Sequence, residues 1–293
     1  MFEIVRHGHA HELLTRSGAF LENRESENNL PLGLAHTLAR DPRYYGDDPP
    51  LLLSILENGN PVGVAVRTPP HRIVLSIFDT VIDAAVDRLV KHLRSSELPV
   101  PGVVGPERES RCFSDTWKKV FPDIAATVST RLRIFEARSV VDVPISPGRM
   151  RLAELEDHPL MAEWIAAFSR EAIGQEADPT EALAKAKKYI GERNLYIWDH
   201  EGPVSIARES RAMKNGTVVT LVYTPPESRN RGYATSCVYE LTKKLLAGRY
   251  RFCSLFTDLA NPTSNRIYPK VGYVPLGDTL EFDFDYTAVP AGC

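Results

Sequence analysis

Cysteine is scarce in this chain, and its residues form no CxxC pair. The four are Cys112, Cys237, Cys253 and Cys293. Their number and spacing argue against a disulfide-stapled secreted fold and against a zinc site built on paired cysteines. We therefore expect reduced thiols, no bound metal and a cytoplasmic location.

Long hydrophobic runs and an excess of one charge are also absent. No apolar stretch approaches the roughly 18 residues of a membrane span. The first residues, MFEIVRHGHA, lack the basic and apolar regions of a secretory signal. Lys and Arg number 35 against 38 Asp and Glu, which gives a formal charge of -3. A strongly basic footprint is missing, so we expect neither a membrane nor a nucleic acid as partner.

The chain is long enough for two domains. It has 293 residues, of which 43% are hydrophobic, and a domain takes roughly 100–200 residues. A strand-like alternation covers 129–144, and a second strand-like run begins at 149, after Pro147 and Gly148. We place a linker at about 141–149 and predict domains of residues 1–143 and 144–293.

The second half has the pattern of a mixed α/β fold. Apolar spacing predicts helices over 157–172, 178–194 and 233–248, the second with Asp178 as N-cap and Pro179 at its first position. Between and after them, the sequence predicts the strands NLYIWDH, PVSIARES, TVVTLVYT, RFCSLFTD, YVPLG and LEFDF. TVVTLVYT is almost continuously apolar or β-branched, which is typical of a buried central strand.

The first half repeats this order more faintly. Residues 50–78 predict three strands, 81–97 an amphipathic helix, 102–105 a short strand and 113–121 a helix. Two halves with a similar order suggest a duplication. The connection after the presumed fourth strand of this half reads Ser76-Ile77-Phe78-Asp79-Thr80, which is acidic and has no glycine.

The segment 220–238 carries the clearest chemical signal. A buried strand leads into Arg229-Asn230-Arg231-Gly232-Tyr233-Ala234 and then into a helix. A glycine turn at a helix start exposes several backbone N–H groups, and the helix dipole adds positive charge. The two arginines can add charge-assisted contacts. This pattern favours a phosphate-binding loop, although an ordinary strand–loop–helix connection with solvated arginines has the same appearance.

A second motif follows the strand RFCSLFTD. It begins at Asn261-Pro262-Thr263-Ser264-Asn265 and continues to Tyr268 and to Gly272-Tyr273. In this order and spacing, the two motifs resemble the GCN5-related N-acetyltransferase (GNAT) superfamily, which has an Arg/Gln-x-x-Gly-x-Gly/Ala loop and a later Asn and Tyr seven residues apart. The matching residues are Arg229, Gly232, Ala234, Asn261, Tyr268 and Gly272-Tyr273, and the resemblance covers about residues 149–286.

The resemblance implies an α/β fold of two GNAT-like lobes, each a mixed, mostly antiparallel twisted sheet flanked by helices. The N-terminal lobe, 1–143, would be degenerate and 144–293 would be the catalytic acetyltransferase domain. Acetyl-CoA would be the cosubstrate, with no metal, lying between splayed strands. The residues that would contact it are Val222, Tyr223, Thr224, Arg229, Asn230, Arg231, Gly232, Tyr233, Ala234, Thr235, Asn261, Asn265 and Tyr268.

The resemblance also implies direct transfer to an amine, with Tyr268 as general acid. A phenol with an ordinary pKa of about 10 is protonated at neutral pH and can donate to a departing thiolate. Pro269 departs from the family pattern, and a tyrosine on the buried face of a short helix is the structural alternative. For the general base we name Glu209, with Glu227 and Glu171 as further candidates.

Two other functions remain open at this stage. One is a non-catalytic acyl-CoA sensor. The other is a phosphohydrolase, because Arg6-His7-Gly8 resembles the start of the histidine-phosphatase family. His7, His9 and His11 share one strand face and could also hold a metal, although surface histidines explain them equally. For an acetyltransferase, we expect a small-molecule amine as acceptor and a monomer or homodimer.

Overall fold

The computed structural model describes residues 1–96, 98–174, 176 and 178–287, which divide into two compact units. The first unit comprises Met1–Ile134 and residues 276–293, and the second comprises Phe135–Pro275. The sequence analysis placed the boundary at 143/144 and kept the last residues in the second half. Cys293 lies outside the described residues, and the other three cysteines are free thiols.

The first unit follows the order strand, two helices, three strands, helix, strand, helix, strand. Its elements are β1 (Phe2–Arg6), α1 (Ala10–Glu22), α2 (Asn29–Arg40), β2 (Leu51–Glu57), β3 (Asn60–Arg67), β4 (Ile73–Leu75), α3 (Ile82–Ser95), β5 (Gly102–Pro106), α4 (Glu107–Val120) and most of β6 (Ala125–Ala137). The sequence analysis named no element over α1 and α2. Every element that it predicted between 50 and 121 is present.

The second unit repeats the same order. It contains β7 (Arg149–Leu152), the 3₁₀ turn η1 (Leu155–Asp157), α5 (His158–Phe168), the π-helical turn η2 (Ser169–Ile173), α6 (Pro179–Gly191), β8 (Leu195–Asp199), β9 (Pro203–Ser210), β10 (Gly216–Tyr223), the 3₁₀ turn η3 (Pro226–Ser228), α7 (Tyr233–Ala247), β11 (Phe252–Asp258) and α8 (Pro262–Val271). The side chain of Asp178 caps α6 by accepting from the Thr180 N–H at 2.8 Å, as predicted.

Strand pairing is the same in both units. In the first, β1 to β4 pair antiparallel in chain order and β4 pairs parallel with β5. In the second, β7 to β10 pair antiparallel and β10 pairs parallel with β11. The two mixed, mostly antiparallel sheets with flanking helices confirm the predicted fold class.

The last strand of the chain, β12 (Val274–Asp285), pairs with β5 of the first unit over Thr279–Asp283. Phe284 stacks on Phe113 and Trp117 of α4, with ring centroids 6.4 and 5.8 Å apart. These contacts explain why 276–293 belongs to the first unit, although it follows the second along the chain. Strand β6 lies beside β12 in the hydrogen-bonding order.

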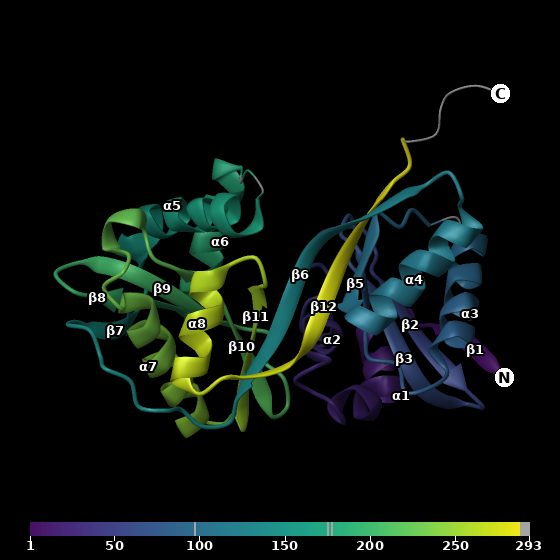
Figure 1. The fold of residues 1–293 in the computed structure, drawn as a ribbon, viewed down its shortest axis with the longest axis horizontal. Helices are drawn as coiled ribbons and strands as arrows, with labels where there is room; N and C mark the ends of the chain where they lie inside the picture. The colour runs from purple at the N-terminus through teal and green to yellow at the C-terminus, as the bar shows by residue number, and fades with distance from the viewer. Residues whose placement is uncertain (97, 175, 177, 288–293) are drawn as a thin grey trace. The chain divides into compact units, whose positions relative to one another are not determined.

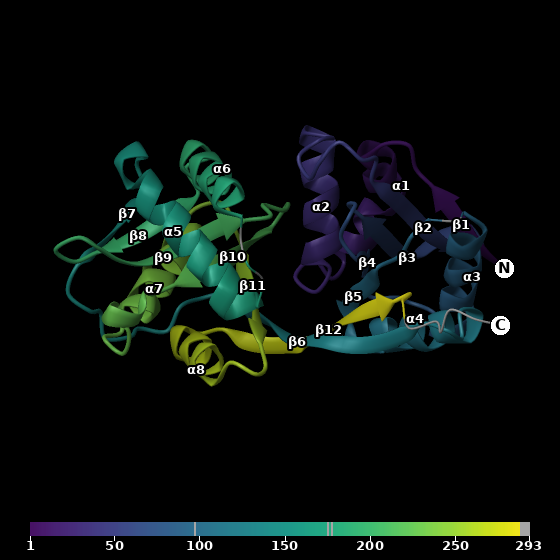
Figure 2. The ribbon, with the colours of Figure 1, turned by 90° about the horizontal axis from the view of Figure 1, so that it is seen from above.

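Each sheet is covered on both faces (Figures 1 and 2). In the first unit, Leu51, Leu53 and Ile55 of β2 face a core shared with α3 and α4. Ser54, on the other face, contacts Ser17 of α1. In the second unit, one core joins the sheet to α7 and α8 and another joins it to α5 and α6. In the described part of the chain, no helix combines the length and apolarity that crossing a bilayer requires.

Candidate active site

The central feature of the second unit is the divergence of β10 from β11. These parallel strands pair only where Gly216–Val218 faces Phe252–Ser254. Further along, β10 carries an irregularity against β9 between Thr220 and Tyr223, and Leu221 adopts a positive φ of 51°. A bulge of this kind takes peptide groups out of the ladder and re-aims a strand. The two neighbouring strands thereby separate, as the sequence motifs implied.

A cavity of about 650 Å³ lies at this divergence. Four segments of the second unit wall it: the end of α5 with η2, the end of β10, the loop leading into α7, and the stretch from Asn261 through α8. Its lining residues are Phe168, Glu171, Ala172, Val222, Tyr223, Thr224, Ser228, Arg229, Asn230, Gly232, Tyr233, Ala234, Thr235, Asn261, Ile267, Tyr268 and Lys270. Eleven of these are among the thirteen predicted contacts.

The loop before α7 forms a concave backbone surface. Asn230 and Gly232 both have positive φ, at 62° and 80°, and Gly232 is the N-cap. No described side chain caps this helix end, so its first N–H groups are open to an anion. Ser146 supports the loop from outside: its Oγ donates to the Arg231 carbonyl at 2.8 Å, and its N–H donates to Ser236 Oγ at 2.9 Å.

Arg229 does not point freely into this cradle. Its Nε donates to the Thr224 carbonyl at 3.0 Å, and its Nη2 forms an ion pair with Glu171 of η2. The Tyr223 hydroxyl also donates to Glu171, at 3.1 Å. Burial alone would raise the pKa of Glu171, but the hydrogen bonds from Arg229 and Tyr223 outweigh it and lower that pKa. Glu171 is therefore a carboxylate at neutral pH.

Tyr268 lines the cavity and is only 6% exposed. Its ring packs near Phe135 and Tyr273, with centroids 6.3 and 5.9 Å away. Burial raises the pKa of its phenol to about 12, so the hydroxyl keeps its proton across the physiological range. Pro269 is accommodated inside α8, and the Tyr268 carbonyl accepts from the Tyr273 N–H at 3.1 Å.

Three predicted site residues do not line the cavity. Glu209 of β9 accepts from the Tyr250 hydroxyl at 2.6 Å, beside the start of β11. The amide group of Asn265 is used locally, because it accepts from Thr257 Oγ1 and donates to the Asp258 and Leu259 carbonyls. Arg231 is exposed outside the cavity, and so is Glu227, one of the further base candidates. Of the carboxylates considered as bases, only Glu171 reaches the cavity.

The sequence analysis missed five lining residues. Phe168 and Ala172 stand four residues apart at the helix end, a spacing that signals one shared face, but this spacing does not distinguish a cavity wall from a buried core. Ser228, Ile267 and Lys270 flank the two motifs, and nothing in their local sequence separates them from ordinary loop and helix residues. Lys270 brings a cation that the motif pattern did not include.

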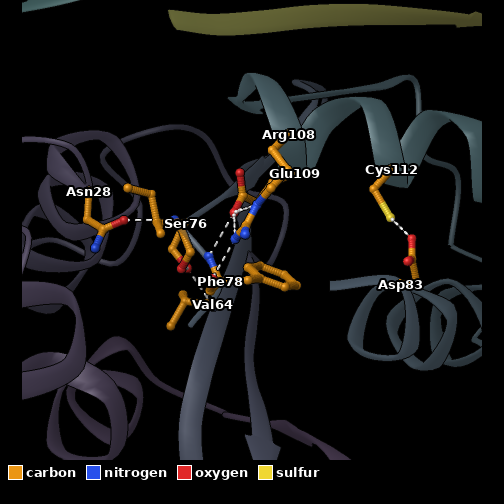
Figure 3. Close-up of polar contacts among 9 residues, drawn as sticks. Asn28, Val64, Ser76, Phe78, Asp83, Arg108, Glu109 and Cys112 are labelled. Atoms are coloured by element: carbon orange, nitrogen blue, oxygen red, sulfur yellow. Dashed lines mark hydrogen bonds and ion pairs between the residues drawn. The ribbon is translucent and has the colours of Figure 1, made fainter. Parts of the chain in front are cut away.

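The corresponding connection of the first unit is closed (Figure 3). Phe78, 2% exposed, packs into the core, and a Cβ at Gly63 would lie 2.8 Å from its ring. The buried Glu109 carboxylate accepts from the Phe78 N–H at 3.1 Å and from Arg108 at 2.7 Å. The side-chain oxygen of Asn28 accepts from the Ile77 N–H at 2.9 Å. Side chains thus occupy two of the backbone donors that follow β4, and the Ser76 and Asp79 N–H groups donate to the Val64 and Val62 carbonyls.

The N-terminal histidine motif shows no open site. His7 is 8% exposed, and its Nε2 shares a hydrogen bond of 2.8 Å with Ser54, whose side chain is fully buried. Burial lowers the pKa of His7, which leaves the ring neutral at pH 7. Because the ring is buried and Nε2 is hydrogen-bonded to Ser54, this nitrogen does not face an open site. Among the described residues, no three His, Cys, Asp or Glu side chains are grouped so that they could hold a metal.

Comparison with known proteins agrees with this geometry. Residues 201–280 match the family model described as FR47-like protein. An acetyltransferase from the GNAT family of Colwellia psychrerythraea has a TM-score of 0.57 and 13% identity, covering 97% of this chain and 100% of its own. A GCN5-related N-acetyltransferase from Sphaerobacter thermophilus has a TM-score of 0.59 and 13% identity, covering 97% and 95%. A search of curated proteins finds no match.

A tandem GNAT protein from the clavulanic acid biosynthesis pathway has a TM-score of 0.57 and 11% identity, with both chains covered over 100%. The chain therefore has the GNAT fold, as the resemblance predicted, and residues 201–280 match the FR47-like family model. The acyltransferase class predicted from the sequence is the class to which these structural neighbours are assigned.

The left-handed backbone at Gly232 leads to a stability prediction. An added Cβ would have to keep a positive φ, at a cost of roughly 1–2 kcal/mol, and would lie 2.7 Å from Ser146 Oγ. Gly232→Ala should lower the free energy of unfolding in urea by more than that conformational cost. In a Ser146→Ala background the clash is absent, so the same change should cost only about 1–2 kcal/mol.

Gly191 is the matched control, since it ends α6 and a Cβ there meets nothing within 4 Å. Gly191→Ala should be neutral or stabilising by up to about 1 kcal/mol. Equal changes in the free energy of unfolding at the two glycines would contradict the left-handed conformation of Gly232.

Proposed function

We propose that the second unit transfers an acetyl group from acetyl-CoA directly to a primary amine of a small molecule. The observation that carries the proposal is the cavity at the divergence of β10 and β11, floored by an uncapped helix start at Gly232. Such a site has two parts. An open strand edge can pair with a ligand that contains amide groups, and the N–H groups of a helix start can bind a phosphate.

The substrate fits the arrangement in two parts. The pantetheine arm carries amide groups, which can pair with the backbone of Val222, Tyr223 and Thr224 as an added strand does. The diphosphate matches the N–H groups of Tyr233–Thr235, where a side chain at Gly232 would block close approach. Asn261 and Lys270, from the stretch that contains α8, can supply further polar contacts.

The chemistry proposed is a single acyl transfer. The neutral amine attacks the thioester carbonyl carbon, the C–S bond breaks, and sulfur departs with the electron pair as thiolate. Tyr268 donates its proton to that sulfur, and the proton of the amine leaves to water. A phenol with a pKa of about 12 is almost fully protonated before the reaction and is therefore ready to act as the acid.

A cavity of about 650 Å³ is in the range of small-molecule sites, roughly 300–1,000 Å³, and we assign its lining to acetyl-CoA. A small amine is proposed as acceptor because the formal charge of -3 does not favour a target bound to a polyanion. The direct test is release of free thiol from acetyl-CoA in the presence of amines, amino acids and amine antibiotics. At least one amine should accelerate release in proportion to enzyme. Binding of acetyl-CoA without release for any acceptor would instead identify an acyl-CoA sensor.

We propose that the first unit binds no acetyl-CoA, because Phe78, Glu109 and Asn28 close the equivalent connection. Calorimetric titration of the full chain should give one acetyl-CoA per chain. A stoichiometry of two would show that the closed connection opens to ligand.

Tyr268→Phe should lower kcat by about 10²–10⁴-fold, the usual contribution of a general acid. The phenyl ring keeps the packing, so affinity for acetyl-CoA should change little. Because the pKa of Tyr268 is about 12, wild-type kcat should also show no loss from its ionisation below about pH 11.

Tyr273→Phe is the matched control. The Tyr273 hydroxyl is buried and bonds Thr242 Oγ1 at 2.8 Å, outside the cavity. Its removal should cost about 1 kcal/mol of stability and leave kcat intact. A Tyr268→Phe enzyme with wild-type kcat would assign the proton donor to water instead.

A further inference from the structure

The cavity wall contains one internal ion pair, and it involves a residue expected to meet the substrate. Arg229 belongs to the loop motif, yet its guanidinium is already bound to the Glu171 carboxylate and to the Thr224 carbonyl. Glu171 and Arg229 come from segments 58 residues apart, η2 and the loop after β10. Both line the cavity. The Glu171 carboxylate is thus already bound to the guanidinium group that we expect the phosphates of acyl-CoA to contact.

We propose that Glu171 is an internal counter-ion that the phosphates of acyl-CoA displace from Arg229. The inference rests on the proposed function. Carboxylate and phosphate both bind the planar fork of a guanidinium, so the two anions compete for the same donors. A diphosphate entering beside a charged Glu171 is also repelled by it. Binding is therefore favoured when Arg229 exchanges the carboxylate for the phosphate.

The exposure of the pair makes this exchange feasible. The side chains of Arg229 and Glu171 are each 43% exposed. Ion pairs in contact with water contribute little to stability, so the pair can open at low cost. Lys270, the other cation lining the cavity, has no ion-pair partner among the described residues and remains available to phosphate throughout. The competition therefore modulates affinity and does not prevent binding.

The exchange also has a structural consequence. Glu171 sits in the π-helical turn η2 that extends α5, and Phe168 and Ala172 of the same helix end line the cavity. When Arg229 leaves Glu171, this helix end loses its ion pair with the loop after β10, and the hydrogen bond from Tyr223 of β10 to Glu171 remains. Occupancy by acyl-CoA is thereby coupled to the cavity wall that this helix end forms.

The test is the affinity of Glu171→Gln for acetyl-CoA, measured by calorimetry on the full chain at low and high salt. Glutamine keeps the size and one acceptor oxygen but removes the charge. We expect acetyl-CoA to bind about two- to fivefold more tightly at low ionic strength, the effect of removing an exposed ion pair. The gain should shrink at high salt because screening weakens the pair in the wild type.

Two comparisons isolate the pair. Glu163→Gln removes the same charge from the exposed side of α5, outside the cavity, and should leave the affinity unchanged. In an Arg229→Gln background the competition no longer exists, so adding Glu171→Gln should bring no further gain. Thermal melting of each variant checks that the fold is retained, and Glu171→Ser provides a second neutral replacement.

Each outcome decides the proposal. Equal or weaker acetyl-CoA binding by folded Glu171→Gln and Glu171→Ser would overturn it, and so would an undiminished gain without Arg229. Unchanged acetyl-CoA affinity with a raised KM for the amine would assign Glu171 to the acceptor instead. Absence of acetyl-CoA binding by the wild type would reject the proposed function itself, which separates that failure from failure of the counter-ion.

Discussion

The structure of the second unit depends on one constraint: β10 cannot stay paired with β11 beyond Val218. The positive φ at Leu221 and the register shift against β9 turn the strand away from its parallel neighbour. The divergence leaves an edge of backbone polar groups without a ladder, and it places the start of α7 and the inner face of α8 around the same space. The cavity, the open start of α7 and the position of Tyr268 all follow from it.

The two units show how the same topology can be open or closed. Both run strand, two helices, three strands, helix, strand, helix, and both pair their strands alike. In the second unit a long β10 and a glycine loop leave backbone donors open. In the first, β4 has three residues, and the Glu109 carboxylate accepts from the Phe78 N–H that follows this strand. A buried carboxylate on a backbone N–H satisfies a donor that would otherwise be costly to leave unpaired.

Charge in the cavity is set by partners that are remote in sequence. Arg229 alone would make the loop a cationic site, but Glu171 neutralises it, and Lys270 restores a net positive wall. Glu209 shows the reverse case, since its carboxylate is used by Tyr250 and does not reach the cavity. The partner that a charged side chain contacts therefore decides whether that side chain lines the cavity or is used elsewhere in the fold. Long side chains can reach partners on different elements.

The sequence by itself determined most of the elements, although not α1 and α2, and most of the loop chemistry. Helix periodicity, the Asp178 cap, the need for glycine at position 232 and the short connection without glycine after β4 are local properties, encoded by residues within a few positions of one another. Tertiary structure alone decided the rest: that β12 pairs with β5 in the first unit, that Asn265 braces the end of β11, and that Glu171 holds Arg229. Strand partners and the contacts of long side chains depend on residues far apart in the chain, and no local pattern encodes them.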